Sequence, residues 1–397
     1  DGEGQIITFV YDALGRTINK LPSELETVIY SYDNWSNLIS LIDKSGATSY
    51  SYDNNNLLLS EVKTISDLGQ NYTINRSYYD DKQLNTLTDA SGKVINYEYD
   101  NRGLLSNVKD GDTVLASYIY TPQGKPEVLT YNNGVATNYT YDDLHRLSVL
   151  EINNASSTSL FKHEYSYDAE SNRTQLVENG LRTVNYTYDN LEQLTGVNYS
   201  DLSETNDINF SYDAWGNRTS LVTPLGTTNY NYEVDGNELT SYTQNGRLTV
   251  DMAYDGNGSL TQENYSRLGK DIRSANYSWD TQNRLEQIEY SYLGRPTYLP
   301  TLPNNVLQFA YDDFGNRYKK TVNNESTYYL NNGLTVLNEI TETGTIDKSI
   351  VQGLGQIAEI DKDGKIQFIH TDVLGSTVLI TDDQGEVVAE YEYDVFG

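Results

Sequence analysis

The sequence predicts an all-β protein in which repeated β-hairpins form one long, curved and spiralling sheet. Three observations support this fold class. A Tyr-x-Tyr-Asp motif such as Tyr30-Ser31-Tyr32-Asp33 recurs along the chain, and its second aromatic residue returns every 20 to 32 positions. Glycine or another turn-forming residue follows most of the aspartates by three positions. Sustained apolar spacings of three and four residues, which would indicate helices, are nearly absent. A recurring period of this length is typical of repeat architectures.

The residues within each repeat are sufficient to predict one β-hairpin. The two rings of Tyr-x-Tyr point to the same face of a strand, because side chains alternate with a period of two. The aspartate that follows is a turn former that can bond backbone amides two residues further on. A glycine such as Gly15 or Gly103 then tolerates the positive φ that the turn needs. A short apolar strand follows, as in residues 38–42, and a second turn closes the unit, as in residues 43–46.

The motif positions are therefore predicted to be structural. Two copies carry Thr121 and Glu233 in place of aspartate, so we interpret the aspartate as a turn former and not as a catalyst. We expect the rings to pack on one another across strands, at roughly 0.2–1 kcal/mol per pair. The alternative is that exposed tyrosine rows bind sugar rings. The predicted structural residues are Tyr30, Tyr32, Asp33, Tyr50, Tyr52, Asp53, Tyr97, Tyr99, Asp100, Tyr139, Tyr141, Asp142, Tyr165, Tyr167, Asp168, Tyr186, Tyr188, Asp189, Tyr212, Asp213, Gly216, Tyr311, Asp312 and Gly315.

Composition and repeat number bound the shape. Hydrophobic residues make up 37% of the chain, and 36 tyrosines stand against 7 phenylalanines, which favours thin aromatic contacts over a thick aliphatic core. Fourteen repeats predict about 28 strands and a ribbon roughly 130 Å long, at about 4.8 Å per strand. Twisted sheets of that length curl. We therefore expect a curved strip that forms part of a hollow shell.

Irregular spacing divides the chain into three parts. Longer gaps predict loop insertions at residues 61–75, 153–162, 199–208 and 295–306, and the last of these holds three of the seven prolines. We predict a hairpin array over residues 1–294, a proline-containing loop over 295–306, and degenerate repeats over 307–397, with strands richer in Ile, Val and Leu from 334 to 380. The sequence opens beside a repeat tyrosine and stops inside a turn, so we interpret it as a segment of a longer polypeptide.

The charge excludes several classes of partner. There are 57 acidic and 27 basic residues, for a net charge of −30, so the surface repels nucleic acid and anionic membranes. The absence of cysteine excludes a disulfide framework and a thiolate metal site. No apolar run approaches the ~18 residues of a membrane span. We expect no nucleic-acid partner and no membrane insertion.

The sequence offers few candidates for catalysis or metal binding. The histidines, His145, His163 and His370, lack a metal-ligand spacing. His370 could form a triad with Asp372 and Ser376, but three such residues within seven positions favour a structural turn. Residues 255–258 and 361–364 resemble parts of calcium loops and are interpreted first as turns. A hydrolase would need an acid pair or triad assembled from distant repeats. We predict no enzyme, no cofactor and no metal site.

Two groups of motifs carry a family resemblance. The Gly-Asn-Arg that follows the aspartate in residues 213–218 and 312–317 resembles the YD repeats of the Rhs (rearrangement hot spot) family. Residues 370–376, 381–388 and 391–397 resemble the start of the Rhs repeat-associated core. The core-motif residues are His370, Asp372, Gly375, Ser376, Asp382, Gly385, Tyr393, Asp394 and Gly397.

The resemblance implies a spiral of hairpins that forms a shell. In bacterial Rhs and wall-associated proteins, and in the B and C subunits of Tc insecticidal complexes, such a shell encloses a variable C-terminal toxin. A similar shell serves cell adhesion in animal teneurins. The family core continues into a self-cleaving segment that this chain lacks. The resemblance thus implies a non-enzymatic shell segment of a secreted or cell-surface bacterial protein, whose partner is a C-terminal toxin or cargo domain of the same polypeptide. The alternative is a module for adhesion or for binding cell-surface glycans.

Overall fold

The computed structural model describes residues 1–22, 26–200, 207–234, 236–293 and 305–393. These residues contain 35 strands, which form one antiparallel sheet in chain order, and they contain no helix. Each strand pairs with the strands before and after it, while β1 and β35 stand at the two ends of an unclosed sheet. The predicted all-β class is confirmed.

The strands have the following bounds. The first twelve are β1 (Ile7–Tyr11), β2 (Thr17–Pro22), β3 (Val28–Tyr32), β4 (Leu38–Asp43), β5 (Gly46–Tyr52), β6 (Leu58–Ile65), β7 (Gln70–Tyr78), β8 (Leu84–Thr88), β9 (Val94–Tyr99), β10 (Leu105–Asp110), β11 (Thr113–Tyr120) and β12 (Pro126–Tyr131). The next twelve are β13 (Ala136–Tyr141), β14 (Leu147–Asn153), β15 (Ser159–Tyr167), β16 (Arg173–Glu178), β17 (Arg182–Tyr188), β18 (Leu194–Ser200), β19 (Ile208–Tyr212), β20 (Arg218–Thr223), β21 (Gly226–Tyr232), β22 (Leu239–Gln244), β23 (Leu248–Tyr254) and β24 (Leu260–Arg267). The last eleven are β25 (Lys270–Trp279), β26 (Leu285–Tyr292), β27 (Asn305–Tyr311), β28 (Arg317–Val322), β29 (Glu325–Asn332), β30 (Thr335–Ile340), β31 (Ile346–Gln352), β32 (Gln356–Asp361), β33 (Ile366–Thr371), β34 (Thr377–Asp382) and β35 (Val387–Glu390).

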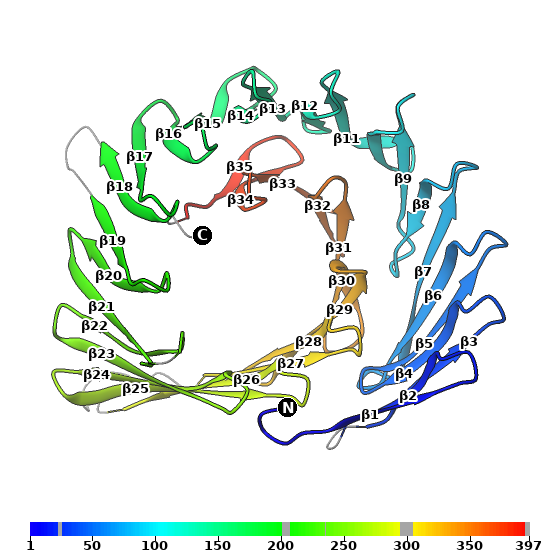
Figure 1. Cartoon of the computed structure of the whole chain (residues 1–397). Helices are drawn as coiled ribbons and strands as arrows, with labels where there is room; N and C mark the ends of the chain where they lie inside the picture. The colour runs from blue at the N-terminus through cyan, green and yellow to red at the C-terminus, as the bar shows by residue number, and fades with distance from the viewer. Residues whose placement is uncertain (23–25, 201–206, 235, 294–304, 394–397) are drawn as a thin grey trace.

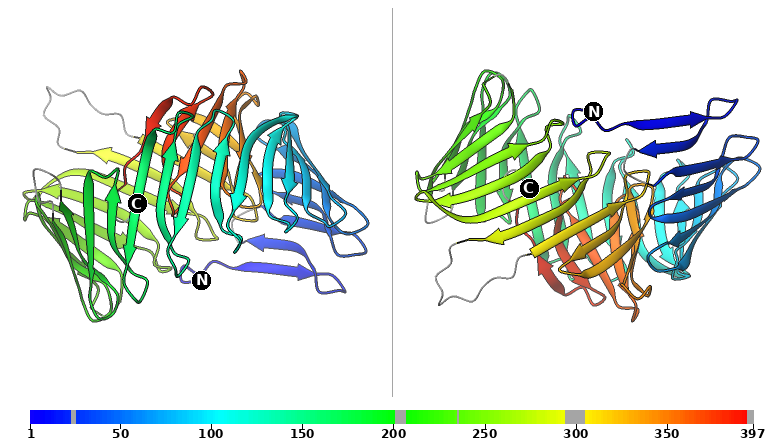
Figure 2. Two further views of the ribbon diagram at one scale, coloured as in Figure 1. Left: turned by 90° about the horizontal axis from the view of Figure 1, so that it is seen from above. Right: turned by 90° about the horizontal axis from the view of Figure 1, so that it is seen from below.

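The sheet curls into a ring and then continues inside it (Figure 1). We call strands β1 to β27 the outer wall and strands β28 to β35 the inner strip. The inner strip lies inside the ring, beside the part of the wall that contains β6 to β17 (Figure 1). The strands run across the width of the band, so the β-turns form its two edges (Figure 2). Because the sheet is antiparallel throughout, the turns that follow odd-numbered strands all share one edge.

The hydrophobic core lies between the wall and the strip. One cluster joins Val108 and Leu115 of the wall to Leu337 and Phe368 of the strip, and all four are almost fully buried. A second cluster joins wall residues such as Leu150 to Val378 and Leu379 of β34. The prediction of thin aromatic contacts is therefore wrong for this part of the molecule. The Ile, Val and Leu residues of the strip meet aliphatic residues of the wall, and the two faces together make a thick aliphatic core.

Two of the loop insertions predicted from the motif spacing are wrong. Residues 61–75 form the ends of β6 and β7, paired from Ser60↔Asn75 to Ile65↔Gln70, because the strand alternation simply continues. The segment 153–162 holds the end of β14, a turn over residues 154–158 and the start of β15, so it is not a loop insertion. The other two predicted insertions, residues 199–208 and 295–306, lie largely outside the described residues, and the second of them is also the predicted boundary. Strands β26 and β27, on either side of this boundary, pair with each other. The strand number exceeds 28 because degenerate repeats also form hairpins.

Candidate functional site

The aspartate of each repeat caps the β-turn that follows it. Asp33 Oδ1 accepts hydrogen bonds from the amides of Trp35 at 2.8 Å and Asn37 at 2.9 Å. The amide of Asp33 donates to the carbonyl oxygen of Asn37, and Ser36 takes the left-handed conformation with φ of 69°. The register shifts next to Tyr32. Each unit is thus a turn with a bulge, a geometry in which one residue must have positive φ.

The same capping recurs around the molecule. At Asp12 and Asp100 the pKa is held below the usual value, first by the backbone amide four residues further on. Thr121, which replaces aspartate, caps the amide of Lys125 with its hydroxyl group at 3.2 Å. The aspartates whose Oδ1 accepts from both turn amides include Asp12, Asp33, Asp53, Asp100, Asp142, Asp189, Asp213, Asp255, Asp280, Asp361, Asp372 and Asp382. Asp168 and Asp312 accept the amide four residues on.

In most repeats, the second tyrosine of the motif bonds the repeat to the previous one. Tyr52 of β5 donates its hydroxyl hydrogen to the carbonyl oxygen of Leu38 at the start of β4, at 2.9 Å. In one repeat Trp279 Nε1 replaces the hydroxyl group and donates to the Leu260 carbonyl at 2.8 Å. The equivalent donors include Tyr32, Tyr78, Tyr99, Tyr120, Tyr141, Tyr167, Tyr188, Tyr212, Tyr232, Tyr254 and Tyr393.

The first tyrosine of the motif faces the inside of the band. Tyr97 and Tyr165 are buried in the two core clusters, and burial raises the pKa of Tyr139 to about 12. Burial likewise raises the pKa of Tyr50 and Tyr186. Tyrosine has a structural role at such positions, because its ring packs in the interior while its hydroxyl group can bond a polar partner.

Guanidinium groups cover many tyrosine faces in the described residues. Arg273 lies 4.6 Å from the ring centroid of Tyr265 and 4.5 Å from that of Tyr290. Arg218 lies 4.7 Å from the ring centroid of Tyr230. Direct ring pairs occur across strands, as between Tyr230 and Tyr242, and within one strand, as between Tyr118 and Tyr120. The predicted ring ladders are therefore accompanied by stacks in which a cation covers the ring, a contact that the Tyr-x-Tyr pattern did not suggest.

A polar seam closes the ring where β2 to β4 meet the turns after β25 and β27. We use this name for Lys20, Tyr30, Asp43, Gln282 and Asp313. Lys20 Nζ lies 2.7 Å from Asp313 Oδ1 and 2.6 Å from Gln282 Oε1, and both charged side chains are almost fully buried. Tyr30 donates its hydroxyl hydrogen to Asp313, whose own amide donates to Asp43 Oδ2 at 2.8 Å. Burial and this hydrogen bond raise the pKa of Tyr30.

Further around the ring, buried side chains of the wall hydrogen-bond the inner strip. The hydroxyl group of Tyr72 donates to the Gly344 carbonyl at 2.9 Å, and that of Tyr131 donates to the Ile369 carbonyl at 2.9 Å. Asn338 Nδ2 of β30 donates to Asp89 Oδ2 at 2.9 Å. These bonds satisfy polar groups inside the core, so they fix one position of the strip against the wall.

The core-motif residues divide between the interior and two turns. His370 is fully buried, with Nε2 at 2.8 Å from Thr381 Oγ1, and burial lowers its pKa to about 4. Asp372 instead caps the turn at the edge by accepting from the Ser376 amide. The structure thus does not assemble a triad from these residues.

The remaining core-motif residues complete these turns. Gly375 and Gly385 have φ values of 85° and 84°, and Asp382 caps the second turn. Asp394 and Gly397 lie outside the described residues. Of the other histidines, His145 occupies the left-handed turn position, and burial lowers the pKa of His163 in β15. The described residues contain no group of three or more His, Cys, Asp or Glu side chains placed to hold a metal ion.

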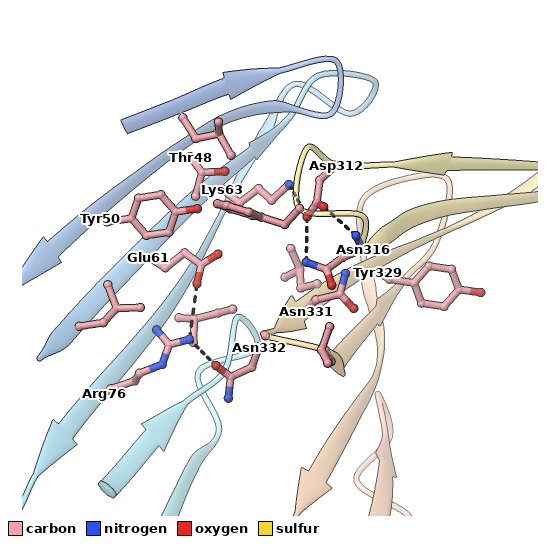
Figure 3. Close-up of a pocket in the computed structure, with 17 residues that line it drawn as sticks. Thr48, Tyr50, Glu61, Lys63, Arg76, Asp312, Asn316, Tyr329, Asn331 and Asn332 are labelled. Carbon is pink, nitrogen blue, oxygen red and sulfur yellow. Dashed lines mark hydrogen bonds and ion pairs between the residues drawn. The ribbon is translucent and has the colours of Figure 1, made fainter. Parts of the chain in front are cut away.

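A pocket of about 300 Å³ opens where the wall meets the start of the inner strip (Figure 3). Glu61 and Lys63 of β6 and Arg76 of β7 approach it from the wall, and Asp312 approaches from the turn after β27 (Figure 3). Arg76 Nη2 lies 2.7 Å from Asn332 Oδ1 and 3.4 Å from Glu61 Oε2. Lys63 Nζ lies 3.9 Å from Asp312 Oδ2.

Two buried carboxyl groups from distant repeats thus share this pocket. Burial raises the pKa of Glu61, and Arg76 and Lys63 oppose that shift. Burial likewise raises the pKa of Asp312, against the effect of Lys63. Asp312 also accepts from the amide of Asn316, so it keeps its role in the repeat turn. Each of the two carboxyl groups therefore already has a structural partner in the pocket.

Sequence reasoning missed the residues that join distant parts of the ring. Lys20 and Asp313 are 293 positions apart, and Asn338 and Asp89 are 249 positions apart. Asp313 stands beside a motif aspartate, and Asp89 begins a predictable turn, but neither feature indicates a partner. Most turn caps and hydroxyl bonds of the motif, by contrast, stay within a repeat or reach the neighbouring one, although the motif residues Tyr30 and Asp312 also contact Asp313 and Lys63 across the ring.

These features define a shell of repeated β-hairpins in which most units are capped by an aspartate and tied by a tyrosine. The model of the teneurin YD-shell family matches residues 2–161 and 135–397, so the chain belongs to that family. This result confirms the predicted YD-repeat resemblance. In the described residues, no helix is long and apolar enough to cross a membrane.

Relatives and solved structures agree with this assignment. The chain is 32% identical over 124 residues to the tRNA3(Ser)-specific nuclease WapA of Bacillus spizizenii and to the tRNA nuclease WapA of Bacillus subtilis (strain 168). Those matches cover 30% of this chain and 5% of each relative. The crystal structure of TcdB2-TccC3 superimposes with a TM-score of 0.67 at 16% identity, over 99% of this chain and 23% of that chain. The Photorhabdus luminescens Tc holotoxin pore gives a TM-score of 0.60 at 15% identity, over 98% of this chain and 24% of that chain.

Proposed function

We propose that this chain is a non-enzymatic wall segment of a shell that encloses a polypeptide cargo. The cargo would be a C-terminal toxin or cargo domain of the same polypeptide, in a secreted or cell-surface bacterial protein. One observation carries the proposal: the sheet curls back inside itself, and buried contacts hold the two layers together. Such a wall can keep a polypeptide away from solvent and from its target.

The named relatives support this role without extending their activities to this chain. The WapA relatives are named as nucleases, and the similar structures are named as parts of Tc toxins. This chain spans 5% of those relatives and less than a quarter of those structures. The wall contributes containment in our proposal, while any toxic activity would reside in the enclosed part.

The described tyrosines give less support to glycan binding through exposed tyrosine rows. Motif tyrosines such as Tyr52, Tyr99 and Tyr141 use their hydroxyl groups on backbone carbonyls of the neighbouring repeat. Arg146 and Arg273 also cover the ring faces of Tyr167 and Tyr265. A sugar would have to displace these contacts.

Limited proteolysis tests the containment. The polypeptide that carries this segment together with its C-terminal continuation is digested, and the fragments are identified by mass spectrometry. We expect a C-terminal fragment to resist cleavage while the wall is intact. Lys20→Met, which breaks the polar seam, should expose that fragment earlier. Lys362→Met is the control, because Lys362 pairs with Asp363 at the exposed surface. A C-terminal part that is digested freely while the wall remains whole would contradict containment.

A further inference from the structure

The pocket between β6 and the turn after β27 is balanced in charge. Glu61 and Asp312 contribute two carboxyl groups, and Lys63 and Arg76 contribute two cations. An anion such as phosphate would meet both carboxylates, and a polyamine would meet both cations. These like-charge contacts are unfavourable in a partly buried site. A neutral ligand encounters neither penalty.

Hydrogen-bonding capacity in the pocket is left unused. The Nζ atom of Lys63 makes no hydrogen bond to the described residues: it lies 3.9 Å from Asp312 Oδ2, beyond hydrogen-bond range, and 5.8 Å from the ring centroid of Tyr318. Oε2 of Glu61 accepts a hydrogen bond from Arg76, whereas Oε1 of Glu61 has no hydrogen bond within the described part of the chain. Both side chains are more than four-fifths buried. Unused donors and an unused acceptor therefore line the same space.

The remaining lining combines polar side chains such as Asn316 and Asn331 with an apolar part. Leu58 and Ile74 of the wall and Leu330 of β29 line the pocket, and Phe314 stands half-exposed at the turn after β27. Small-molecule sites commonly combine such apolar walls with a few polar groups that orient the ligand. A hydroxyl group both donates and accepts, so adjacent hydroxyl groups can satisfy an ammonium and a carboxylate together.

We propose that this pocket binds a neutral sugar of monosaccharide size. The hydroxyl groups would bond Lys63 and Glu61, while the C–H face of the ring would rest on the apolar wall. The volume of about 300 Å³ lies at the lower end of ligand-sized pockets. This binding site differs from the tyrosine rows and does not depend on containment of a cargo.

Saturation-transfer NMR on the whole 397-residue chain tests the proposal. The probes are methyl α-D-glucopyranoside, methyl β-D-galactopyranoside and N-acetylglucosamine, with inorganic phosphate and spermidine as charged comparisons. We expect saturation transfer to at least one sugar and no binding of phosphate or spermidine. Lys63→Met and Glu61→Gln should each weaken sugar binding about tenfold, as loss of one hydrogen bond to a charged group predicts.

Lys109→Met is the matched control. Lys109 pairs with Glu98 outside the pocket and is also partly buried. This variant should bind the sugar as the unchanged protein does, and circular dichroism checks that every variant folds. If Lys63→Met does not fold, Glu61→Gln decides the test, since it keeps the size of the side chain. The proposal fails if no probe sugar binds, if the pocket variants bind as the control does, or if phosphate or spermidine binds instead.

Discussion

Two sectors of the outer wall use the same hairpin for different purposes. In the covered sector, β6 to β17, side chains such as Leu115, Leu150 and Ile152 are completely buried against the inner strip. In the uncovered sector, β21 to β27, the buried hydrophobic residues among the described ones are Val250 and Ala275. There, Arg273 covers the rings of Tyr265 and Tyr290.

The comparison separates local from distant requirements. Both sectors keep the aspartate turn and the tyrosine hydroxyl bond to the neighbouring repeat, as Asp142 and Tyr141 show in one sector and Asp255 and Tyr254 in the other. Only the inner-face chemistry changes, because one face meets another layer and the other face does not. Hairpin geometry is therefore encoded within the repeat, whereas the inner face is adapted to its cover.

The largest expected effect is the loss of a ring from the core between the layers. Phe368→Ala should lower the free energy of unfolding by about 3–5 kcal/mol, because Phe368 is almost completely buried. Phe309→Ala, in the uncovered sector, is the matched control and should have a clearly smaller effect, since Phe309 is only partly buried. Denaturant unfolding measures both variants. Equal losses would remove the distinction between the sectors.

Acid should weaken the core between the wall and the inner strip through His370 of β33. Its pKa is about 4 in the folded protein and about 6.5 in an unfolded chain. A lowered pKa means that the stabilisation is complete above pH 6.5 and is lost as the pH falls toward 4, with a total loss of about 3 kcal/mol. The difference in unfolding free energy between pH 7 and pH 4 should shrink in His370→Gln. It should stay unchanged in His145→Asn, which alters an exposed turn. A pH dependence that His370→Gln leaves intact would contradict this role.

Removal of a stacked guanidinium should affect the uncovered sector. Arg273→Met should lower the free energy of unfolding by about 1–2 kcal/mol, because two ring faces lose their cation. Arg102→Met is the comparison: Arg102 lies 5.9 Å from the ring centroid of Tyr120, and its side chain is more exposed, so a smaller loss is expected. Thermal unfolding of the two variants would rank them. A larger loss for Arg102→Met would argue against the stacks as the cover of the open sector.

The smallest expected effect should be the same in both sectors. Tyr141→Phe and Tyr232→Phe each remove a hydroxyl bond to a carbonyl of the neighbouring repeat, at 2.8 and 3.0 Å. Each should lower the free energy of unfolding by about 1 kcal/mol. Denaturant unfolding of the two variants checks the equality. A loss confined to Tyr141→Phe would show that the bond matters only beneath the inner strip.

The sequence predicted the hairpins because their causes are local. The ring alternation of Tyr50 and Tyr52, the cap of Asp53 and the left-handed residue Asn56 all lie within a few positions of one another. The strand count was underestimated where the motif fades, as between residues 334 and 380, although the strands there are regular.

The contacts between layers could not be predicted in the same way. The richness of residues 334–380 in Ile, Val and Leu was visible, but its cause lies in wall residues such as Leu115, more than 200 positions away. The pairing of Lys20 with Asp313 depends on the summed curvature of all intervening hairpins. Small differences in twist at each turn add up along the sheet, so the residues of any one turn do not indicate the total curvature.

The bonds between the layers also bear on how such a protein can change length. One extra hairpin in the covered sector would displace the wall by two strands, or about 10 Å, against the inner strip. That shift would separate Tyr131 from the carbonyl of Ile369 and leave both groups buried without partners. An extra hairpin in the uncovered sector needs to match only its two neighbours and can bulge outward. The number of repeats is thus constrained in the covered sector and adjustable in the uncovered sector. Family members of different length are therefore expected to differ in the uncovered sector.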